Sequence, residues 1–137
     1  MIESRFGRSS GLIVVDASIV GPRRTVTITL ALDTGSTETV ISPWVVDATG
    51  YSVRDGEELT RVRSAIGDEQ GYTLRVTRFA TLGLACSNFR VHVFDLADGY
   101  GIDGLVGLSF LDLLNYEIRS ADGLFRAVPV NPGLLES

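Results

Sequence analysis

The residues of this chain whose types and spacing best suit chemistry are Asp33, Thr34, Gly35 and Ser36, which directly follow the segment Thr25–Leu32. Apolar side chains recur at every second position of that segment, at Val26, Ile28, Leu30 and Leu32. This period of two predicts a half-buried β-strand, after which the aspartate enters a tight turn that glycine permits. A carboxylate placed in this way at the end of a strand is a candidate acid or base.

A second motif, Leu105, Val106 and Gly107, begins 72 residues after Asp33 (105 − 33 = 72). The interval leaves room for a hairpin and two or three strands. The aspartate turn alone would be a weak signal, because aspartate and glycine are common in ordinary turns. The order of several features is more specific, since a short strand is also expected over Thr39–Ser42, directly after the turn.

Taken together, these motifs resemble those of the retroviral-type, or retropepsin-like, aspartic proteases, from about Leu12 to Val130. The resemblance implies an all-β fold, a single-lobe retropepsin-like acid protease barrel with a flap hairpin and one or two short helices. It also implies roles for the motif residues. Asp33 would be catalytic, in an active-site turn completed by Thr34, Gly35 and Ser36. The supporting apolar-apolar-glycine motif beside that turn would be Leu105, Val106 and Gly107.

The resemblance also implies what each neighbour of Asp33 does. Gly35 would donate its backbone N–H to the carboxylate. Thr34 would donate its hydroxyl across a subunit interface and so lock two turns together. Ser36 could hydrogen-bond the outer carboxylate oxygen, which would favour an acidic optimum.

Peptide hydrolysis by this class needs two carboxylates around one water, one as base and one, protonated, to polarise the scissile carbonyl. Only one such triplet is present in 137 residues. A second Asp33 would therefore come from another copy, in a homodimer with a two-fold axis through the site. Two carboxylates that share a proton titrate as a pair, as is known for this class, which predicts a bell-shaped, acid-leaning pH profile. The substrates would be peptides or proteins bound in extended form.

The flap is expected from two strand-like runs, Leu59–Ile66 and Tyr72–Phe79, with a polar tip between them that is flanked by glycines. In the family, the hairpin at this position closes over the bound peptide. The residues that would contact substrate there are Ile66, Gly67, Asp68, Glu69, Gln70 and Gly71.

Further strands are expected over Leu12–Val15, Ala17–Val20, Thr81–Leu84, Phe89–Leu96, Tyr116–Arg119 and Leu124–Val130. A helix is expected over Trp44–Thr49, with Ser42 as N-cap and Gly50 as its end, and Trp44 is expected to pack against the core. A second helix is expected over Phe110–Leu114, where Ser109 and Asp112 suit a capping box.

The domain itself is expected over residues 12–130. Met1–Gly11 is polar, charged and interrupted by glycine, so a flexible N-terminal arm is expected there, and residues 131–137 form a C-terminal tail. Because Leu124–Val130 is more apolar, we expect it to carry more of the dimer interface. Pro129 argues against a central strand position there.

Composition excludes several other classes. The chain has 137 residues, 45% of them hydrophobic, which suits one domain with a substantial core. Its net charge of −5 and its lack of a basic cluster make nucleic acid a poor partner. No apolar run is long enough to cross a bilayer, so a membrane tether could lie only outside this chain. Cys86 is the single cysteine, which excludes an internal disulfide and favours a reducing compartment such as the cytoplasm. With His92 as the single histidine, a structural zinc site is not expected, and neither is another metal or a cofactor.

Three alternatives compete with the protease hypothesis. The glycines of the sequence Gly99-Tyr-Gly-Ile-Asp-Gly104 match a dinucleotide-binding fingerprint, but the first glycine comes too late after the strand, and few helices surround it. Asp95, Asp98 and Asp103 suggest a calcium loop, but their spacing is not that of an EF-hand. The third alternative is a non-catalytic retropepsin-like module that dimerises or binds peptide, against which the intact Asp-Thr-Gly-Ser sequence argues.

Overall fold

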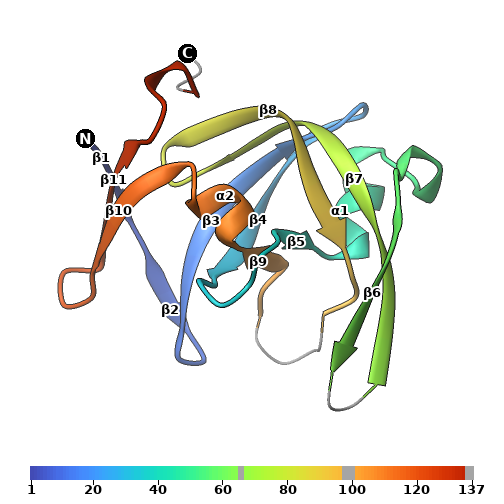
Figure 1. Ribbon diagram of the computed structural model, residues 1–137, viewed down its shortest axis with the longest axis horizontal. Coiled ribbons are helices and arrows are strands. Elements are labelled where there is room, and N and C mark those ends of the chain that lie inside the picture. The colour runs from blue at the N-terminus through green and yellow to red at the C-terminus, as the bar shows by residue number, and fades with distance from the viewer. Residues whose placement is uncertain (65–66, 97–100, 135–137) are drawn as a thin grey trace.

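The computed structural model describes residues 1–64, 67–96 and 101–134, and only the backbone of residues 61–64, 67–69 and 134 (Figure 1). Strands dominate this part of the chain: β1 Ile2–Arg5, β2 Gly7–Ser9, β3 Leu12–Val20, β4 Thr25–Leu32, β5 Val40–Ile41, β6 Leu59–Ser64, β7 Gly67–Thr81, β8 Leu84–Val93, β9 Gly104–Val106, β10 Leu114–Arg119 and β11 Leu124–Pro129. The helical elements are short: α1 Pro43–Thr49, α2 Leu108–Leu111, and the 3-10 turns η1 Val53–Asp55 and η2 Pro132–Leu134. The predicted all-β class is confirmed.

Six strands close into a barrel. The larger sheet has the order β2-β3-β4-β9-β5-β8-β7-β6, and β3 also pairs with β7, which joins the two ends of the series β3-β4-β9-β5-β8-β7. β4 pairs with one edge of β3 along Val14–Val20, and the other edge is long enough to pair with β2 at Leu12–Val14 and with β7 at Ala17–Val20. The two strands expected on either side of Asp16 are one continuous strand. Asp16 does not interrupt it, because its side chain is exposed on the outer face.

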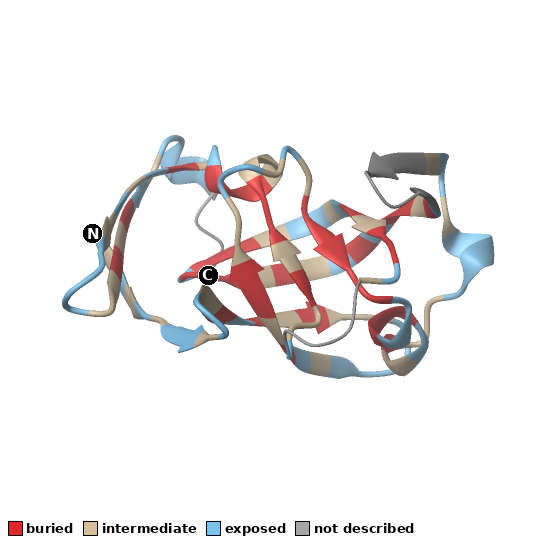
Figure 2. Cartoon of the chain, turned by 90° about the horizontal axis from the view of Figure 1, so that it is seen from below, coloured by how far each residue is buried: buried red, intermediate tan, exposed pale blue. Residues whose placement is uncertain are grey.

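The core of the barrel is apolar and follows the alternation read from the sequence (Figure 2). Ile28 and Leu30 of β4 are 2% and 0% exposed. Three aromatic rings tie α2 to the barrel wall: Phe110 of α2 meets Phe79 of β7 and Phe89 of β8, with ring centroids 5.4 and 5.9 Å away. Phe110 is itself fully buried, so the short helix has one fixed position behind β9.

α1 agrees with the predicted helix, and it begins one residue earlier, at Pro43, in the first helical position. Gly50 ends it with a left-handed φ of 96°, and its N–H donates to the carbonyls of Val46 and Asp47. Ser42 is the N-cap, although its side chain makes no capping bond. The prediction that Trp44 packs against the core is wrong, since its side chain is 48% exposed.

α2 was predicted too late in the chain. It covers Leu108–Leu111 with Gly107 as N-cap, and the expected capping box of Ser109 and Asp112 is absent, because Asp112 is the C-cap. The helix ends early because Leu114 already starts β10, where it is buried. Burial of Phe110 and Leu111 decided the position of this helix, and the polar residues did not.

β7 and β8 join at a tight turn, where a continuous strand over Thr81–Leu84 was expected. Leu82 and Gly83 both have left-handed φ values, of 54° and 82°, as the two central residues of a primed hairpin turn require. The methyl groups of Ile2 lie directly over Gly83, so a side chain at that glycine would collide with β1.

The segment expected as an N-terminal arm contains two strands. β1 pairs with β11, and β2 pairs with β3. In β1 the half-buried Ile2 and Ser4 alternate with the exposed Glu3 and Arg5, so its charges lie on one face. The result is a second, three-stranded sheet of order β1-β11-β10, which we call the terminal sheet (Figure 1).

β11 is the central strand of the terminal sheet and tolerates Pro129 because of the register of its neighbours. β1 pairs with Leu124–Ala127 only, so Pro129 lies beyond its reach and faces Leu114 of β10 on the other side. The missing N–H of the proline is therefore not needed on the β1 side. The argument from Pro129 against a central strand was wrong for this reason.

Candidate active site

The candidate catalytic turn, Asp33–Ser36, which we call the catalytic turn below, begins where β4 ends. Asp33 is half-buried, and its N–H donates to the carbonyl of Val106 at 3.0 Å, while its own carbonyl accepts the N–H of Ser36 at 3.2 Å. Oδ1 of Asp33 accepts the N–H of Gly35 at 2.9 Å, as the resemblance implied. Oδ2 makes no hydrogen bond within the part of the chain that the structure describes. One carboxylate oxygen is thus fixed, and the other is open to a water or a substrate.

Gly35 lies close to the carboxylate of Asp33 and has an ordinary backbone angle. Its φ is not among the positive values of the chain, so the turn does not require a left-handed residue at this position. A Cβ at this position would lie 3.2 Å from Oδ1 of Asp33. The glycine therefore keeps the catalytic carboxylate close to its hydrogen-bond donor.

The second motif lies directly beside this turn. β9 carries Leu105 and Val106 and is inserted between β4, to which it is parallel, and β5, to which it is antiparallel. The register sets Val106 opposite Leu32, the residue before the aspartate. The structure thus brings together two sequence motifs that are 72 residues apart, as counted above.

Gly107 follows β9 at the tightest contact of the site. A Cβ here would collide with the carbonyl oxygen of Glu38 and would lie 2.7 Å from that of Ser36. The two residues after the glycine bind the chain that follows the turn. The N–H of Leu108 donates to Ser36 O at 2.8 Å, and the N–H of Ser109 donates to Thr37 O at 2.9 Å. The start of α2 thus supports the catalytic turn from behind.

Two hydroxyl groups that the sequence did not single out complete this support. Thr39 is fully buried, and its Oγ1 lies 2.9 Å from Oγ of Ser109. The same oxygen accepts the N–H of Gly107 at 3.3 Å. The sequence signal that could have indicated this role is the position of Thr39 at the start of a short buried strand, because a buried hydroxyl requires a hydrogen-bond partner.

Ser36 has a different partner from the one expected. Its Oγ donates to the carbonyl of Glu38 at 2.8 Å and not to the carboxylate of Asp33. The bond lies within Ser36–Thr39, the segment in which the chain leaves the turn and which we call the support segment, so Ser36 shapes the turn in the single chain. Thr34 is exposed on the same turn, and its expected bond across an interface stays a prediction.

The flap hairpin is present, but its tip lies elsewhere than predicted. Ser64 pairs with Gly67, and the pairing continues through Arg63–Asp68, Val62–Glu69, Arg61–Gln70 and Thr60–Gly71. The residues from Gly67 to Gly71 are therefore part of β7 and not the loop, and Ile66 lies outside the described residues. Gly71 is buried, and a Cβ there would collide with the carbonyl oxygen of Val93. This glycine marks the place where the hairpin leaves the barrel.

The competing sites lose support in the structure. Asp103 is used within the barrel, since its Oδ2 accepts the N–H of Thr29 at 2.9 Å. Gly104 lies in β9 and not at the start of a helix, as a dinucleotide fingerprint would need. Gly99 and Asp98 lie outside the described residues. Among the residues that are described, no three histidine, cysteine or acidic side chains gather at a point where a metal could bind.

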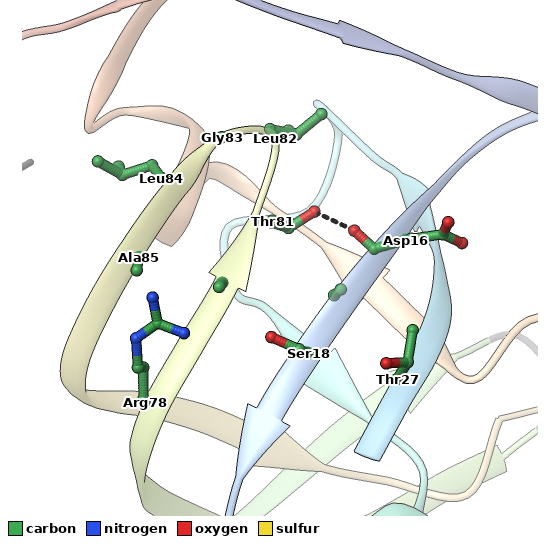
Figure 3. A pocket seen from close by; sticks show the side chains of 11 residues that line it. Asp16, Ser18, Thr27, Arg78, Thr81, Leu82, Gly83, Leu84 and Ala85 are labelled. Carbon is green, nitrogen blue, oxygen red and sulfur yellow. Dashed lines mark hydrogen bonds between the residues drawn. The ribbon is translucent and has the colours of Figure 1, made fainter. Parts of the chain in front are cut away.

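An open hollow of about 380 Å³ lies on the outer face of β3 and β7 (Figure 3). Its lining includes Asp16, Ser18, Arg78 and Ala80, and Oγ1 of Thr81 at its edge donates to the carbonyl of Asp16 at 2.8 Å. None of the residues of the catalytic turn lines it. Short side chains on neighbouring strands account for the hollow without a ligand.

The fold and the turn define a single-lobe, retropepsin-like aspartic protease architecture. The profile of the family described as aspartyl protease matches residues 15–110, which is most of the chain and includes both motifs, and the chain belongs to that family. No curated protein matches it significantly. Within the described residues, no helix is long and apolar enough to span a membrane.

Two solved structures share the fold. A retropepsin-like aspartic protease from Rickettsia conorii is 18% identical, with a TM-score of 0.69 over 91% of this chain and 98% of that one. The retroviral protease-like domain of Ddi1 from Leishmania major is 17% identical, with a TM-score of 0.60 over 88% of this chain and 97% of that one. At such identities the similarity establishes the architecture alone.

Proposed function

We propose that this chain is an aspartic endopeptidase that hydrolyses extended polypeptides as a homodimer. The observation that carries the proposal is the carboxylate of Asp33, held by the N–H of Gly35 at 2.9 Å at the end of a barrel strand. Family membership and fold agree with a hydrolase. A non-catalytic module would have no chemical need for a carboxylate fixed in this way.

The proposed reaction uses two copies of the turn. One Asp33, as the carboxylate, takes a proton from a shared water, whose oxygen attacks the scissile carbonyl carbon. The other Asp33, protonated, polarises the carbonyl oxygen, and the amine then leaves with a proton. Because the two carboxylates share one proton, cleavage should follow a bell-shaped pH profile that leans to acid.

The flap hairpin and the floor formed by the turn would hold the peptide. β6 and β7 extend from the barrel as a two-stranded ribbon (Figure 1), and a peptide bound in extended form would pair with strand-like backbone groups. The residues that we assign to this contact are Gly67, Asp68, Glu69, Gln70, Gly71 and Ile66. Side-chain pockets of the site would select the residues around the scissile bond.

We also propose that the C-terminal hairpin, β10 and β11, contributes to the dimer interface. Val128 and Val130 are 46% and 57% exposed there, which is unusual for two neighbouring apolar side chains. Removing the chain from Leu124 onward would not test this cleanly, because Phe125 is 1% exposed and belongs to the core. Point substitutions at the exposed valines are the better test.

The deciding experiment compares the chain with its Asp33→Asn variant on a mixed peptide library, from acid to neutral pH. We expect the variant to lose about 10²–10⁴-fold of the cleavage rate or more, because it lacks the acid–base group but keeps the size of the side chain. Activity of the parent should fall on dilution, and added D33N subunits should inhibit it by forming mixed dimers. Equal cleavage by both proteins, or no cleavage by a confirmed dimer, would contradict the proposal.

A further inference from the structure

The support segment behind the catalytic turn, Ser36–Thr39, is tied to strand β8 by an acid–histidine pair. Nε2 of His92 lies 3.2 Å from Oε2 of Glu38, an ion-pair distance without the alignment of a good hydrogen bond. The His92 side chain is 12% exposed and that of Glu38 is 35% exposed. The backbone makes a second tie, since the N–H of His92 donates to Thr39 O at 2.8 Å.

The backbone of Glu38 is also where the parts of the active site meet. Its carbonyl oxygen accepts the hydroxyl of Ser36 at 2.8 Å and lies in close contact with Gly107. A shift of Glu38 would therefore move both the residue that ends the catalytic turn and the glycine that supports it. The side chain of Glu38 limits that shift through its contact with His92.

The surroundings of His92 leave Glu38 as its direct acidic neighbour. On β7 the residue opposite is Thr73, whose Oγ1 accepts the N–H of Glu58 at 3.1 Å, and on β5 it is Val40. The ring of Phe94 stacks on the imidazole, with centroids 6.1 Å apart. The other charged groups that face this region are Arg90 of β8, Arg75 of β7, its ion-pair partner Glu57, and Glu58.

Two arginines are near enough to compete with His92 for Glu38. Arg75 and Arg90 line an open groove of about 490 Å³ that Glu38 also lines. Arg75 already has two partners, Oε1 of Glu57 at 3.1 Å and the carbonyl of Asn88 at 3.1 Å. Arg90 is exposed. The contact of Glu38 is with His92, whose side chain is 12% exposed and so more buried than that of either arginine.

We propose that Glu38 and His92 form a pH-sensitive latch that positions the support segment behind the catalytic turn. The functional part of this inference rests on the proposed protease activity. Histidine is the side chain that ordinarily changes charge between about pH 5 and 8, and glutamate is ordinarily ionised above about pH 4.3. A carboxylate attracts an imidazolium far more strongly than a neutral imidazole, so a contact between these two side-chain types is tightest in mild acid and loosens towards neutral pH.

The latch can be measured without any substrate, by hydrogen exchange of the whole chain. The reporters are the amides of Leu108 and Ser109, which donate to Ser36 O and Thr37 O of the support segment. Their protection, corrected for the intrinsic pH dependence of exchange, should fall about two- to five-fold from mild acid to mildly alkaline pH, as befits one partly exposed ion pair. In Glu38→Gln and in His92→Gln this fall should vanish.

Glu3→Gln is the matched control, because it removes a glutamate from an ion pair of similar length, 2.9 Å to Arg126, on the terminal sheet and not on the support segment. It should keep the pH-dependent fall of the parent. E38Q decides alone if H92Q does not fold, since Glu38 is partly exposed and its replacement keeps the side-chain length. The same fall in E38Q as in the parent and in E3Q would overturn the latch.

A second readout connects the latch to catalysis. The ratio of kcat/KM between E38Q and the parent should be lower in mild acid than near neutral pH, whereas E3Q should give a ratio that does not depend on pH. Exchange results as predicted, with no cleavage by any variant, would support the latch and reject the protease function. Cleavage by the parent, with exchange that responds to pH equally in all variants, would support the protease function and reject the latch.

Discussion

The catalytic turn and the terminal sheet are held in place by different forces. The turn is fixed by backbone hydrogen bonds from β9 and α2, and by a glycine contact with carbonyl oxygens that no larger residue could make. The outer face of the terminal sheet is instead held by partly exposed ion pairs, in which Arg126 meets Glu3 at 2.9 Å and Glu117 at 3.7 Å. Exposed valines lie beside them.

This difference separates a closely packed turn from a sheet surface on which charged and apolar side chains are exposed. Backbone contacts in a close-packed site tolerate little change, because neighbouring atoms cannot move apart without breaking other bonds. Exposed ion pairs contribute little to folding, with a median near 0–1 kcal/mol. Substitutions in the two regions should therefore differ in size and also in kind.

The largest effect is expected at Gly107. A Cβ there would collide with the carbonyl oxygen of Glu38 and lie 2.7 Å from that of Ser36. Gly107→Ala should therefore lower the free energy of unfolding by about 1–3 kcal/mol or more, as overpacking does. The displaced turn should also reduce cleavage by about 10²-fold, because small misplacements of catalytic groups are costly. Urea unfolding and peptide cleavage measure the two effects.

Gly7→Ala is the control for this comparison. Gly7 begins β2, and a Cβ there would meet Cγ2 of Val14 at 3.5 Å, an ordinary contact. The free energy of unfolding should change by less than about 0.5 kcal/mol. If G107A proved as stable and as active as G7A, the packing of the glycine against the support segment would not be essential.

The same contrast explains what the sequence could predict. The strand Thr25–Leu32 was predicted with its correct bounds, because its alternation is uninterrupted and a turn residue follows at once. The turn and the glycine motif were found because each depends on residue types that few others can replace. The close packing of these two motifs followed from family resemblance and not from any local pattern.

Other features depended on contacts distant in sequence. β1 is a strand because β11 offers it an edge, although its own residues are mostly polar. The hairpin turn of the flap was misplaced because glycine at Gly67 and Gly71 suggested a loop, whereas Gly71 is required by its contact with β8. The pair of Glu38 and His92 spans 54 residues (92 − 38 = 54), and no local pattern indicates it.

A smaller effect, confined to association, is expected at the exposed valines. Val128→Asp should weaken dimerisation by about tenfold or more, because a two-fold axis repeats the change and each copy would bury a charge beside apolar surface. Unfolding of the monomer should be little affected, since the side chain is 46% exposed. Sedimentation equilibrium measures the association. Val53→Asp is the control, as Val53 is 68% exposed in η1, outside the terminal sheet. Equal dimer affinity in V128D and V53D would place the interface elsewhere.

The smallest effect is expected at the ion pairs on the outer face of the terminal sheet. In Glu3→Gln the carboxylate beside Arg126 is lost, but Arg126 keeps Glu117 as a partner. The free energy of unfolding should fall by less than about 1 kcal/mol, and the difference from the parent should shrink at high salt, where exposed charges are screened. Urea unfolding at low and high salt measures this. A loss as large as that of G107A, or one that salt does not reduce, would show that β1 is held more rigidly than its exposed charges suggest. The terminal sheet would then belong to the same tightly built half-site as the catalytic turn, and the contrast between the two regions would fail.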